Sequence, residues 1–213
     1  MDVDKMSDSD DDVPRLSAET MAALQEFYKS QELTEASDVQ SGISENWNLS
    51  QFWYTDATAE ALAKETLRAA GSTGRIACVS CPSLYKKLQQ LKPATCTTVL
   101  LEFDKRFSVY KDFVFYDFNT PLELANLQKN TFEVVVADPP YLSEECLSKT
   151  AQTVRFLSSG KVILCTGAVM EDLAADLLGV TMCSFVPSHA RNLANVFRCF
   201  TNFDTHYLNQ GNS

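Results

Sequence analysis

The stretch Phe132–Leu142 reads FEVVVADPPYL, and it predicts where a central strand ends. Its apolar residues at positions 134–137 follow one another without alternation, which is typical of a strand buried on both faces of a parallel sheet. The two prolines after Asp138 have no N–H to donate to a sheet ladder, so the strand must stop there. A carboxylate and the ring of Tyr141 therefore stand at the carboxyl end of a buried strand, where open α/β sheets bind their ligands.

The word Asp-Pro-Pro-Tyr at 138–141 offers hydrogen-bond acceptors and an aromatic face. Pro139 and Pro140 have carbonyl oxygens but no N–H, and an ionised Asp138 can only accept. The face of Tyr141 can cover a flat base or a cation. The word resembles motif IV, (D/N/S)PP(Y/F/W), of amino-methyltransferases that use S-adenosylmethionine. That resemblance makes all four residues candidate catalytic residues and implies S-adenosylmethionine as the cofactor; the alternative is a turn that only ends a core strand.

The composition favours one globular domain with extensions. The chain has 213 residues, 45% of them hydrophobic, which is enough to bury a core. Its formal net charge is −10 and its Lys and Arg are scattered, whereas nucleic-acid-binding proteins usually present a basic face. A nucleic-acid substrate is therefore less expected than a basic protein partner. The alternatives are that the acidity only keeps the protein soluble, or that a local basic groove is hidden in the average.

The cysteines indicate a reducing compartment. Most of the seven lie in strand-like apolar runs, as reduced and buried thiols do in intracellular proteins, so we expect a cytoplasmic location. Cys78 and Cys81 form a CxxC, but no second pair follows and the chain has two histidines, so no metal site is expected. We find no apolar run long enough to cross a bilayer and no secretory signal pattern, so no membrane association is expected.

The residues before position 46 are predicted to lie outside the main domain. The segment 1–15 is predicted to be an acidic, disordered tail, because residues 1–13 hold six Asp and one Lys. The segment 16–45 is predicted to form a helix, capped by Ser17 and ending near Gln31, followed by a polar linker. The single catalytic domain is then expected over residues 46–213.

From position 55 onward the pattern predicts alternating helices and strands. Thr55 is expected to cap a helix that Gly71 ends. The predicted helices cover 56–70, 83–91, 121–129, 143–157 and 170–178, and the predicted strands cover 76–80, 98–103, 113–116, 132–137, 161–166, 181–186 and 196–203. Strands that are mostly separated by helices predict an α/β fold with a largely parallel, doubly wound sheet. The last two strands lack a strong helix between them, so we expect an antiparallel pair at one edge.

This order is similar to the seven-stranded, Rossmann-like sheet of class I methyltransferases, over about 46–203. The resemblance implies that the first strand runs into a cofactor loop at Ser80–Ser83. The family usually has a glycine-rich loop there, and this chain has no glycine between Gly74 and Gly160. Dinucleotide sites need such glycines so that backbone can approach a pyrophosphate. S-adenosylmethionine carries no phosphate, so the missing glycines argue against NAD and ATP rather than against this cofactor.

The same resemblance implies which acidic residues bind the cofactor. Class I methyltransferases place an acid after the second strand for the ribose hydroxyls, and Asp104 is the first choice, with Glu102 second. Asp117, after the third strand, is a candidate acceptor for the adenine amino group. The alternatives are a solvated charge pair of Asp104 with Lys105 or Arg106, and for Asp117 an Asx turn.

Three consecutive aromatic residues, at 52–54, precede the capped helix. Phe52 and Trp53 are candidate cofactor-binding residues, because this run stands near the start of the domain and could close over the cofactor or form a wall of the acceptor channel. The alternative is that the run packs an edge of the core.

Five sequence segments, in this order along the chain, extend the resemblance to nearly the whole chain: ENWNLSQFWY, LEFDKRF, VADPPYLSEECL, LCTGAVME and RNLANVFRCF. Together they resemble the family of elongation factor 1-alpha lysine methyltransferase 1, which was first grouped with N6-adenine methyltransferases because of its Asp-Pro-Pro-Tyr motif. The resemblance implies methyl transfer to a lysine of translation elongation factor 1-alpha, and we expect a monomer. The alternatives are an N6-adenine methyltransferase acting on DNA or RNA, favoured by the motif alone, and a catalytically silent scaffold.

Overall fold

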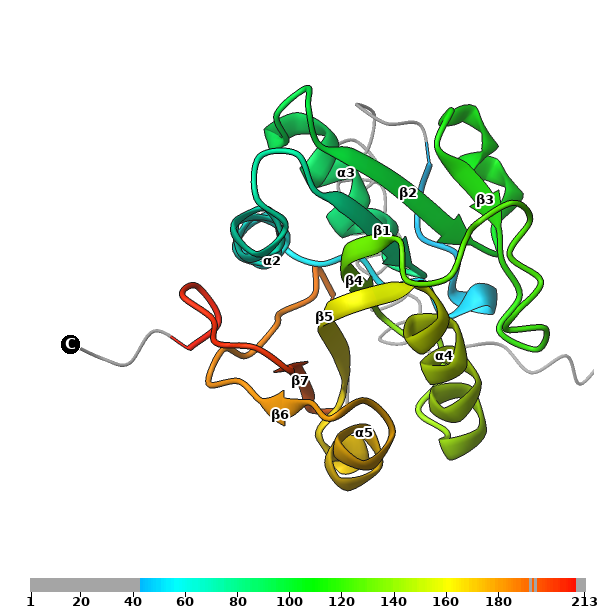
Figure 1. Cartoon of the computed structure of the whole chain (residues 1–213). Coiled ribbons are helices and arrows are strands. Elements are labelled where there is room, and N and C mark those ends of the chain that lie inside the picture. Colours follow the sequence, from blue (N-terminus) through cyan, green and yellow to red (C-terminus); the bar gives the residue numbers. More distant parts are fainter. Residues whose placement is uncertain (1–42, 192, 194, 210–213) are drawn as a thin grey trace, which may run out of the picture. The chain divides into compact units, whose positions relative to one another are not determined.

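The computed structural model describes residues 43–191, 193 and 195–209 (Figure 1). Residues 45–213 form one compact unit, and that unit contains the sheet. The acidic tail predicted over 1–15 and the helix predicted from Ser17 to about Gln31 lie outside the described residues. These two assignments stay predictions.

The centre of the unit is a seven-stranded sheet in the order β3-β2-β1-β4-β5-β7-β6. Neighbouring strands from β3 to β5 run parallel, whereas β7 is antiparallel to both β5 and β6. This confirms the predicted mostly parallel sheet with an antiparallel edge. The strands are β1 (Arg75–Val79), β2 (Thr97–Glu102), β3 (Phe113–Phe115), β4 (Phe132–Ala137), β5 (Ser158–Gly167), β6 (Thr181–Met182) and β7 (Phe197–Thr201).

Helices cover both faces of the sheet (Figure 1). One face carries α2 and α3, and the other carries α4 and α5, which explains why residues 134–137 of β4 are completely buried. The described helices are α2 (Asp56–Ala70), α3 (Pro82–Leu91), α4 (Glu144–Leu157) and α5 (Glu171–Leu178), with the short 3-10 helices η2 (Trp47–Leu49), η3 (Lys105–Val109) and η4 (Ala168–Met170). None of the helices in the described part of the chain is both long and apolar enough to span a membrane.

The ends of α2 follow the predicted capping chemistry. The Thr55 hydroxyl accepts a hydrogen bond from the backbone N–H of Thr58 at 3.3 Å, and this pairs one donor of the first turn. Gly71 ends the helix with a φ of 74°, a conformation that residues with a Cβ rarely adopt. Both predictions are confirmed.

Two predicted elements differ from the structure. The helix predicted over 121–129 is wrong: the segment is a chain of turns, and Ala125 has a φ of 49°, which a right-handed helix cannot contain. The apolar spacing was misleading because turns also bring Leu124 into the core. The strand predicted over 181–186 stops at Met182, since the backbone N–H of Phe185 pairs with Leu208 outside the sheet.

A buried glutamate on α2 ties down the C-terminal segment. Glu65 is fully buried; one of its oxygens accepts the backbone N–H groups of His206 and Tyr207 at 2.8 and 2.6 Å, and the other accepts Arg68 Nε at 2.7 Å. The carboxylate therefore satisfies donors that the segment 203–208 could not pair otherwise.

We expect Glu65→Ala to lower the free energy of unfolding by about 3 kcal/mol, because it leaves two backbone donors and a cation without their acceptor. The matched control is Glu60→Ala on the same helix. Glu60 forms a surface pair with Lys64, so its loss should change the free energy of unfolding by less than about 0.5 kcal/mol. Urea unfolding of the two variants checks this, and equal losses would mean that Glu65 is not a structural tie.

Candidate active site

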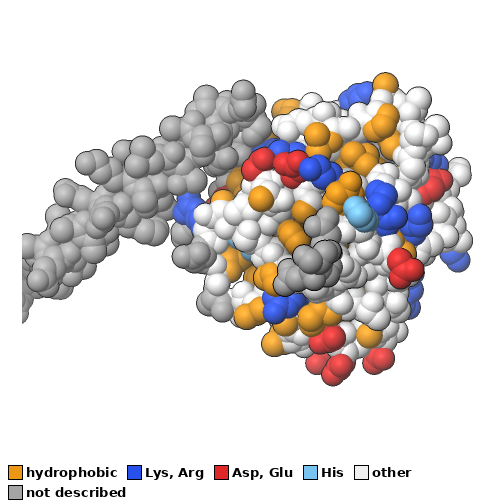
Figure 2. Space-filling model, turned by 90° about the vertical axis from the view of Figure 1, so that its left-hand side faces the viewer, with side chains coloured by type: hydrophobic (Ala, Val, Ile, Leu, Met, Phe, Trp, Pro, Cys, Tyr) orange, Lys and Arg blue, Asp and Glu red, His pale blue; other side chains and the backbone are white. Residues whose placement is uncertain are grey.

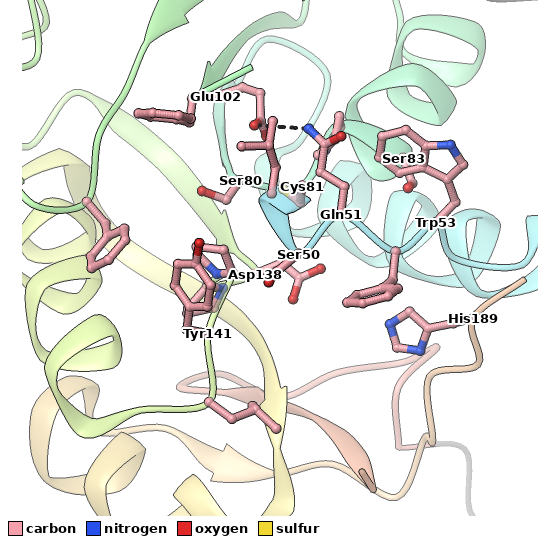
Figure 3. Close-up of a pocket in the computed structure, with 18 of the residues that line it drawn as sticks. Ser50, Gln51, Trp53, Ser80, Cys81, Ser83, Glu102, Asp138, Tyr141 and His189 are labelled. Carbon is pink, nitrogen blue, oxygen red and sulfur yellow. Dashed lines mark hydrogen bonds between the residues drawn. The ribbon is translucent and has the colours of Figure 1, made fainter. Parts of the chain in front are cut away.

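A pocket of about 390 Å³ opens at the carboxyl ends of β1, β2 and β4 (Figure 3). Strand β1 lies between β2 and β4. The chain passes from β1 to β2 and β3 on one side and then crosses to β4 on the other, so the pocket lies at the point where the strand order reverses. Its walls are residues 80–83 after β1, Glu102 and Phe103, residues 117–119 after β3, residues 138–142 after β4, residues 49–53, and His189, Asn195 and Phe197.

The pocket brings together nine of the ten residues predicted from the sequence. All four motif residues line it, as do five predicted cofactor residues: Ser80, Phe52, Trp53, Glu102 and Asp117. The tenth residue, Asp104, is absent from the lining. Among the described residues, no group of three or more His, Cys, Asp or Glu side chains is placed to hold a metal ion.

Asp138 stands at the point where β4 ends. Its backbone N–H donates to the Val79 carbonyl at 3.0 Å, which extends the β1–β4 pairing by one residue, and Pro139 then stops it. One carboxylate oxygen, Oδ2, accepts the Tyr54 hydroxyl at 2.6 Å. Burial raises the pKa of Asp138 to about 7; the bond from Tyr54 opposes this rise, and the nearby Glu102 adds to it. The carboxyl group can thus gain or lose a proton near neutral pH.

The loop after β1 replaces the usual glycine with a serine in an uncommon conformation. Ser80 has a φ of 54°, and its N–H donates to the Leu101 carbonyl of β2 at 2.8 Å. Ser50, which also lines the pocket, has a positive φ as well, of 52°. Two of the four described non-glycine residues with positive φ therefore line this one pocket, and local backbone strain of this kind gathers at functional sites.

Glu102 ends β2, Asp104 follows two residues later, and both share one network with Gln51. The Gln51 amide donates to Glu102 at 3.4 Å, as Figure 3 shows, and more closely to Asp104 at 3.1 Å. Arg106 Nη2 pairs with Asp104 at 2.6 Å. Asp104 also caps η3 by accepting the backbone N–H of Arg106 at 2.9 Å. Asp104 thus pairs with Arg106, but the carboxylate is buried rather than solvated as the sequence alternative had it, while Glu102 lines the pocket.

The environments of the two acids shift their pKa values in opposite directions. Burial raises the pKa of Glu102. The pKa of Asp104 is lowered: burial alone would raise it, but the hydrogen bonds and charge of Arg106, together with Gln51, outweigh that effect.

Aromatic side chains form the mouth of the pocket. Tyr141 is 44% exposed, and its ring packs edge-on against Phe118 with centroids 5.7 Å apart. Asp117 makes an Asx turn, since its side chain accepts the N–H of Asn119 at 2.8 Å, yet it still lines the pocket. Trp53 packs edge-on against Phe107 at 6.1 Å, so it serves both as a wall and as core packing.

The aromatic run at 52–54 was considered as a wall of the site, but the bond of Tyr54 to Asp138 was not predicted, and neither were the places of Gln51, His189 and Phe197. Tyr54 is 84 positions from Asp138, so no local spacing could have paired them. His189 lies in the connection between β6 and β7, and its ring is 5.0 Å from that of Tyr54 and 4.9 Å from that of Phe197. Figure 3 shows His189 at the end of the pocket that holds Asp138 and Tyr141, whereas Glu102 lies at the other end with Gln51.

Known proteins resemble this chain closely. EEF1A lysine methyltransferase 1 of Gallus gallus is 54% identical, over 93% of this chain and 98% of its own length. The protein of the same name from Mus musculus is 55% identical, over 94% and 97%. The chain belongs to the EEF1A lysine methyltransferase 1 family. The model of a broader family, described as "Probable N6-adenine methyltransferase", matches residues 45–205, so the chain belongs to that grouping too.

Solved structures agree on the fold of this family member. A structure described as a "putative RNA methyltransferase" from Pyrococcus horikoshii matches with a TM-score of 0.52 and 13% sequence identity, over 74% of this chain and 88% of that one. At that identity the likeness concerns the fold, and it confirms the predicted class I methyltransferase sheet.

The raised pKa of Asp138 makes stability depend on pH. In the folded protein the carboxyl group keeps its proton up to about pH 7, whereas the unfolded chain releases it near 3.8. The free energy of unfolding of the natural protein therefore falls as the pH rises from about 4 to about 7. We expect the stability of Asp138→Asn relative to the natural protein to increase between pH 4 and pH 7 and to level off above.

Urea unfolding at several pH values measures this difference. A difference that stays flat between pH 4 and pH 7 would mean that Asp138 is not protonated in the folded protein over this window.

Proposed function

We propose that this protein transfers a methyl group from S-adenosylmethionine to the side-chain amine of a lysine in EEF1A. The observation that carries the proposal is the charge of the pocket, whose described lining contains Glu102, Asp117 and Asp138 but neither Lys nor Arg. A sulfonium and a lysine ammonium are both cations, and carboxylates attract both of them. Phosphate groups would meet no cationic partner in this lining.

The cofactor half of the pocket has the groups that an adenosine needs. The Glu102 carboxylate can accept the ribose hydroxyls, and Asp117 can accept the adenine amino group. Phe103, with a ring that is 48% exposed, and Phe118 offer flat apolar surfaces to the base. The positive φ of Ser80 turns the chain out of β1 without a glycine. The residues present therefore fit the cofactor, which supplies an electrophilic methyl group on sulfur.

The acceptor half of the pocket suits an amine. Asp138 and the carbonyl oxygens of Pro139 and Pro140 are acceptors that can orient its N–H groups, and Tyr141 can cover the aliphatic stem or the ammonium. The reacting lysine has an ordinary pKa of about 10.4 and must lose a proton before it attacks. Partial desolvation favours the neutral amine, and Asp138, with a pKa of about 7, can take the proton.

The transfer itself is an in-line displacement. The amine nitrogen forms a bond to the methyl carbon as the sulfur–methyl bond breaks, and the sulfur keeps the electron pair as a neutral thioether. Alignment of the two reactants can contribute on the order of 7–11 kcal/mol to the lowering of the barrier. The protein's main task is therefore to hold the amine on the line of attack.

The protein substrate is proposed from the relatives, which carry the name EEF1A lysine methyltransferase 1. On the face drawn in Figure 2, basic and acidic side chains of the described residues are interspersed, so this face offers no basic band for a phosphate backbone. The net charge of −10 favours a basic partner.

A second candidate is an N6-adenine methyltransferase, favoured by the description of the matching family model and by the motif. An adenine amino group could be held by Asp138 as a lysine amine would be. The two candidates differ in the acceptor, so one assay separates them.

That assay offers radiolabelled S-adenosylmethionine together with purified EEF1A, total RNA or duplex DNA. We expect label on a lysine of EEF1A, and a fall of at least about 100-fold with Asp138→Ala, because the amine loses its acceptor. Asp172→Ala, a carboxylate lost from the exposed start of α5, should stay within about twofold. Label on adenine would overturn the lysine proposal and support the second candidate.

Cofactor binding tests the assignment of Glu102. We expect Glu102→Gln to weaken the binding of S-adenosylmethionine about tenfold, because hydrogen bonds to a charged acceptor become neutral ones. Asp104→Asn should weaken it less than about threefold, since Arg106 and Gln51 already occupy that carboxylate. Isothermal titration calorimetry measures both variants, and the reverse order would return the ribose contact to Asp104.

A further inference from the structure

Tyr54 contacts the catalytic carboxylate without lining the pocket. Its hydroxyl donates to Asp138 Oδ2 at 2.6 Å, a short bond of the charge-assisted kind, and the side chain is 7% exposed. None of the described residues donates a hydrogen bond to the other oxygen, Oδ1. Since Asp138 lines the pocket, this oxygen is the one left to receive an acceptor amine.

Two parts of the fold contact Tyr54 and its neighbour Thr55. The next residue, Thr55, caps α2, and its N–H donates to the Ser188 carbonyl at 3.0 Å. The backbone of Tyr54 forms an antiparallel bridge with His189, and the two rings are 5.0 Å apart. His189 in turn packs edge-on against Phe197 of β7 at 4.9 Å. The hydroxyl is thus fixed between the start of α2 and the β6–β7 connection.

The phenol acts as a donor. Burial and the charge of Asp138 raise the pKa of Tyr54 well above its usual value, so the hydroxyl keeps its proton. A donor on Oδ2 stabilises the ionised carboxylate and restricts its rotation about the Cα–Cβ and Cβ–Cγ bonds. Both effects increase the fraction of enzyme in which Oδ1 faces the pocket as an acceptor.

We propose that Tyr54 is a positioning residue for methyl transfer, which holds the Asp138 carboxylate in one orientation with Oδ1 directed to the acceptor amine. The inference rests on the proposed function for its catalytic consequence. The geometric part concerns this chain alone: the tyrosine that ends the aromatic run at 52–54 is the partner of the motif's first residue.

The decisive variant is Tyr54→Phe, which removes the hydroxyl and keeps the ring against His189. We expect kcat for lysine methylation to fall about 10- to 100-fold, the size of a lost bond to a charged group, while the Kd for S-adenosylmethionine changes less than about twofold. The acidic limb of the pH–rate profile should move to higher pH, because the bond that favours the ionised carboxylate is gone.

Tyr116→Phe is the matched control. Tyr116 is also buried, and its hydroxyl bonds to Thr153 on α4 at 2.9 Å, outside the pocket. This variant loses a buried tyrosine hydroxyl bond too, so it should reproduce any general loss of stability. Its kcat and its pH–rate profile should match those of the natural protein.

A second readout does not depend on activity. The carboxyl carbon of Asp138, assigned in a ¹³C NMR spectrum with Asp138→Asn, should titrate near pH 7 in the natural protein. The midpoint should rise by about one pH unit in Tyr54→Phe and stay unchanged in Tyr116→Phe. The other ionisable groups around Asp138 and Tyr54 include Glu102, His189 and the thiols of Cys81 and Cys199. Burial lowers the pKa of His189, and the raised pKa values of the two thiols keep them neutral.

The outcomes separate the two proposals. A natural protein that methylates no lysine defeats the proposed function, while the NMR titration still tests the contact. A lower kcat for Tyr54→Phe with an unchanged pH–rate profile and an unchanged midpoint would reduce Tyr54 to a structural residue and overturn the inference. A kcat like that of the natural protein would overturn it as well.

Discussion

Asp138 places a partly buried carboxylate at the end of the central strand β4, and the loss of water around this group sets its proton chemistry. The position follows from β4, which is buried on both faces and is stopped by two prolines directly after the aspartate. Burial raises the pKa of the carboxyl group to about 7, so it can exchange a proton near neutral pH. Hydrogen bonding by Tyr54 partly offsets the penalty of burying the charge. A carboxylate exposed elsewhere on the surface would neither line the pocket nor have a raised pKa.

The pocket has two halves, one at the end of β2 and one at the end of β4, and an acidic residue lines each half. Strand β2 ends in Glu102 on the cofactor side, and β4 ends in Asp138 on the acceptor side, with β1 between them. Under the proposed function, acidic residues suit both halves because the methyl donor and the protonated acceptor are both cations. The same reasoning accounts for the loop at Ser80, which can omit the glycines of a dinucleotide site because no pyrophosphate has to approach the backbone.

The segment 45–54 joins these halves from outside the sheet. Gln51 bonds to Glu102 and Asp104 near the cofactor side, and Tyr54 bonds to Asp138 near the acceptor side. At the start of the segment, Glu45 accepts the N–H of Trp53 at 2.7 Å and pairs with Arg191 at 3.1 Å. Residues that precede the first strand therefore complete a site whose chemistry stands at the strand ends.

Several properties of this protein follow from local patterns along the chain. The unbroken apolar run before Asp138, the proline stop, the cap at Thr55 and the alternation of strands and helices were enough for the sheet and the candidate motif, because they depend on neighbours along the chain. The turns over 121–129 were not predicted, because their apolar spacing resembles that of a helix and the left-handed backbone of Ala125 cannot be read from a sequence. Two features could be seen only in the folded protein: Glu102 rather than Asp104 lines the pocket, and Tyr54 bonds to Asp138. Burial and contacts between distant segments set both, and these arise only when the chain has folded.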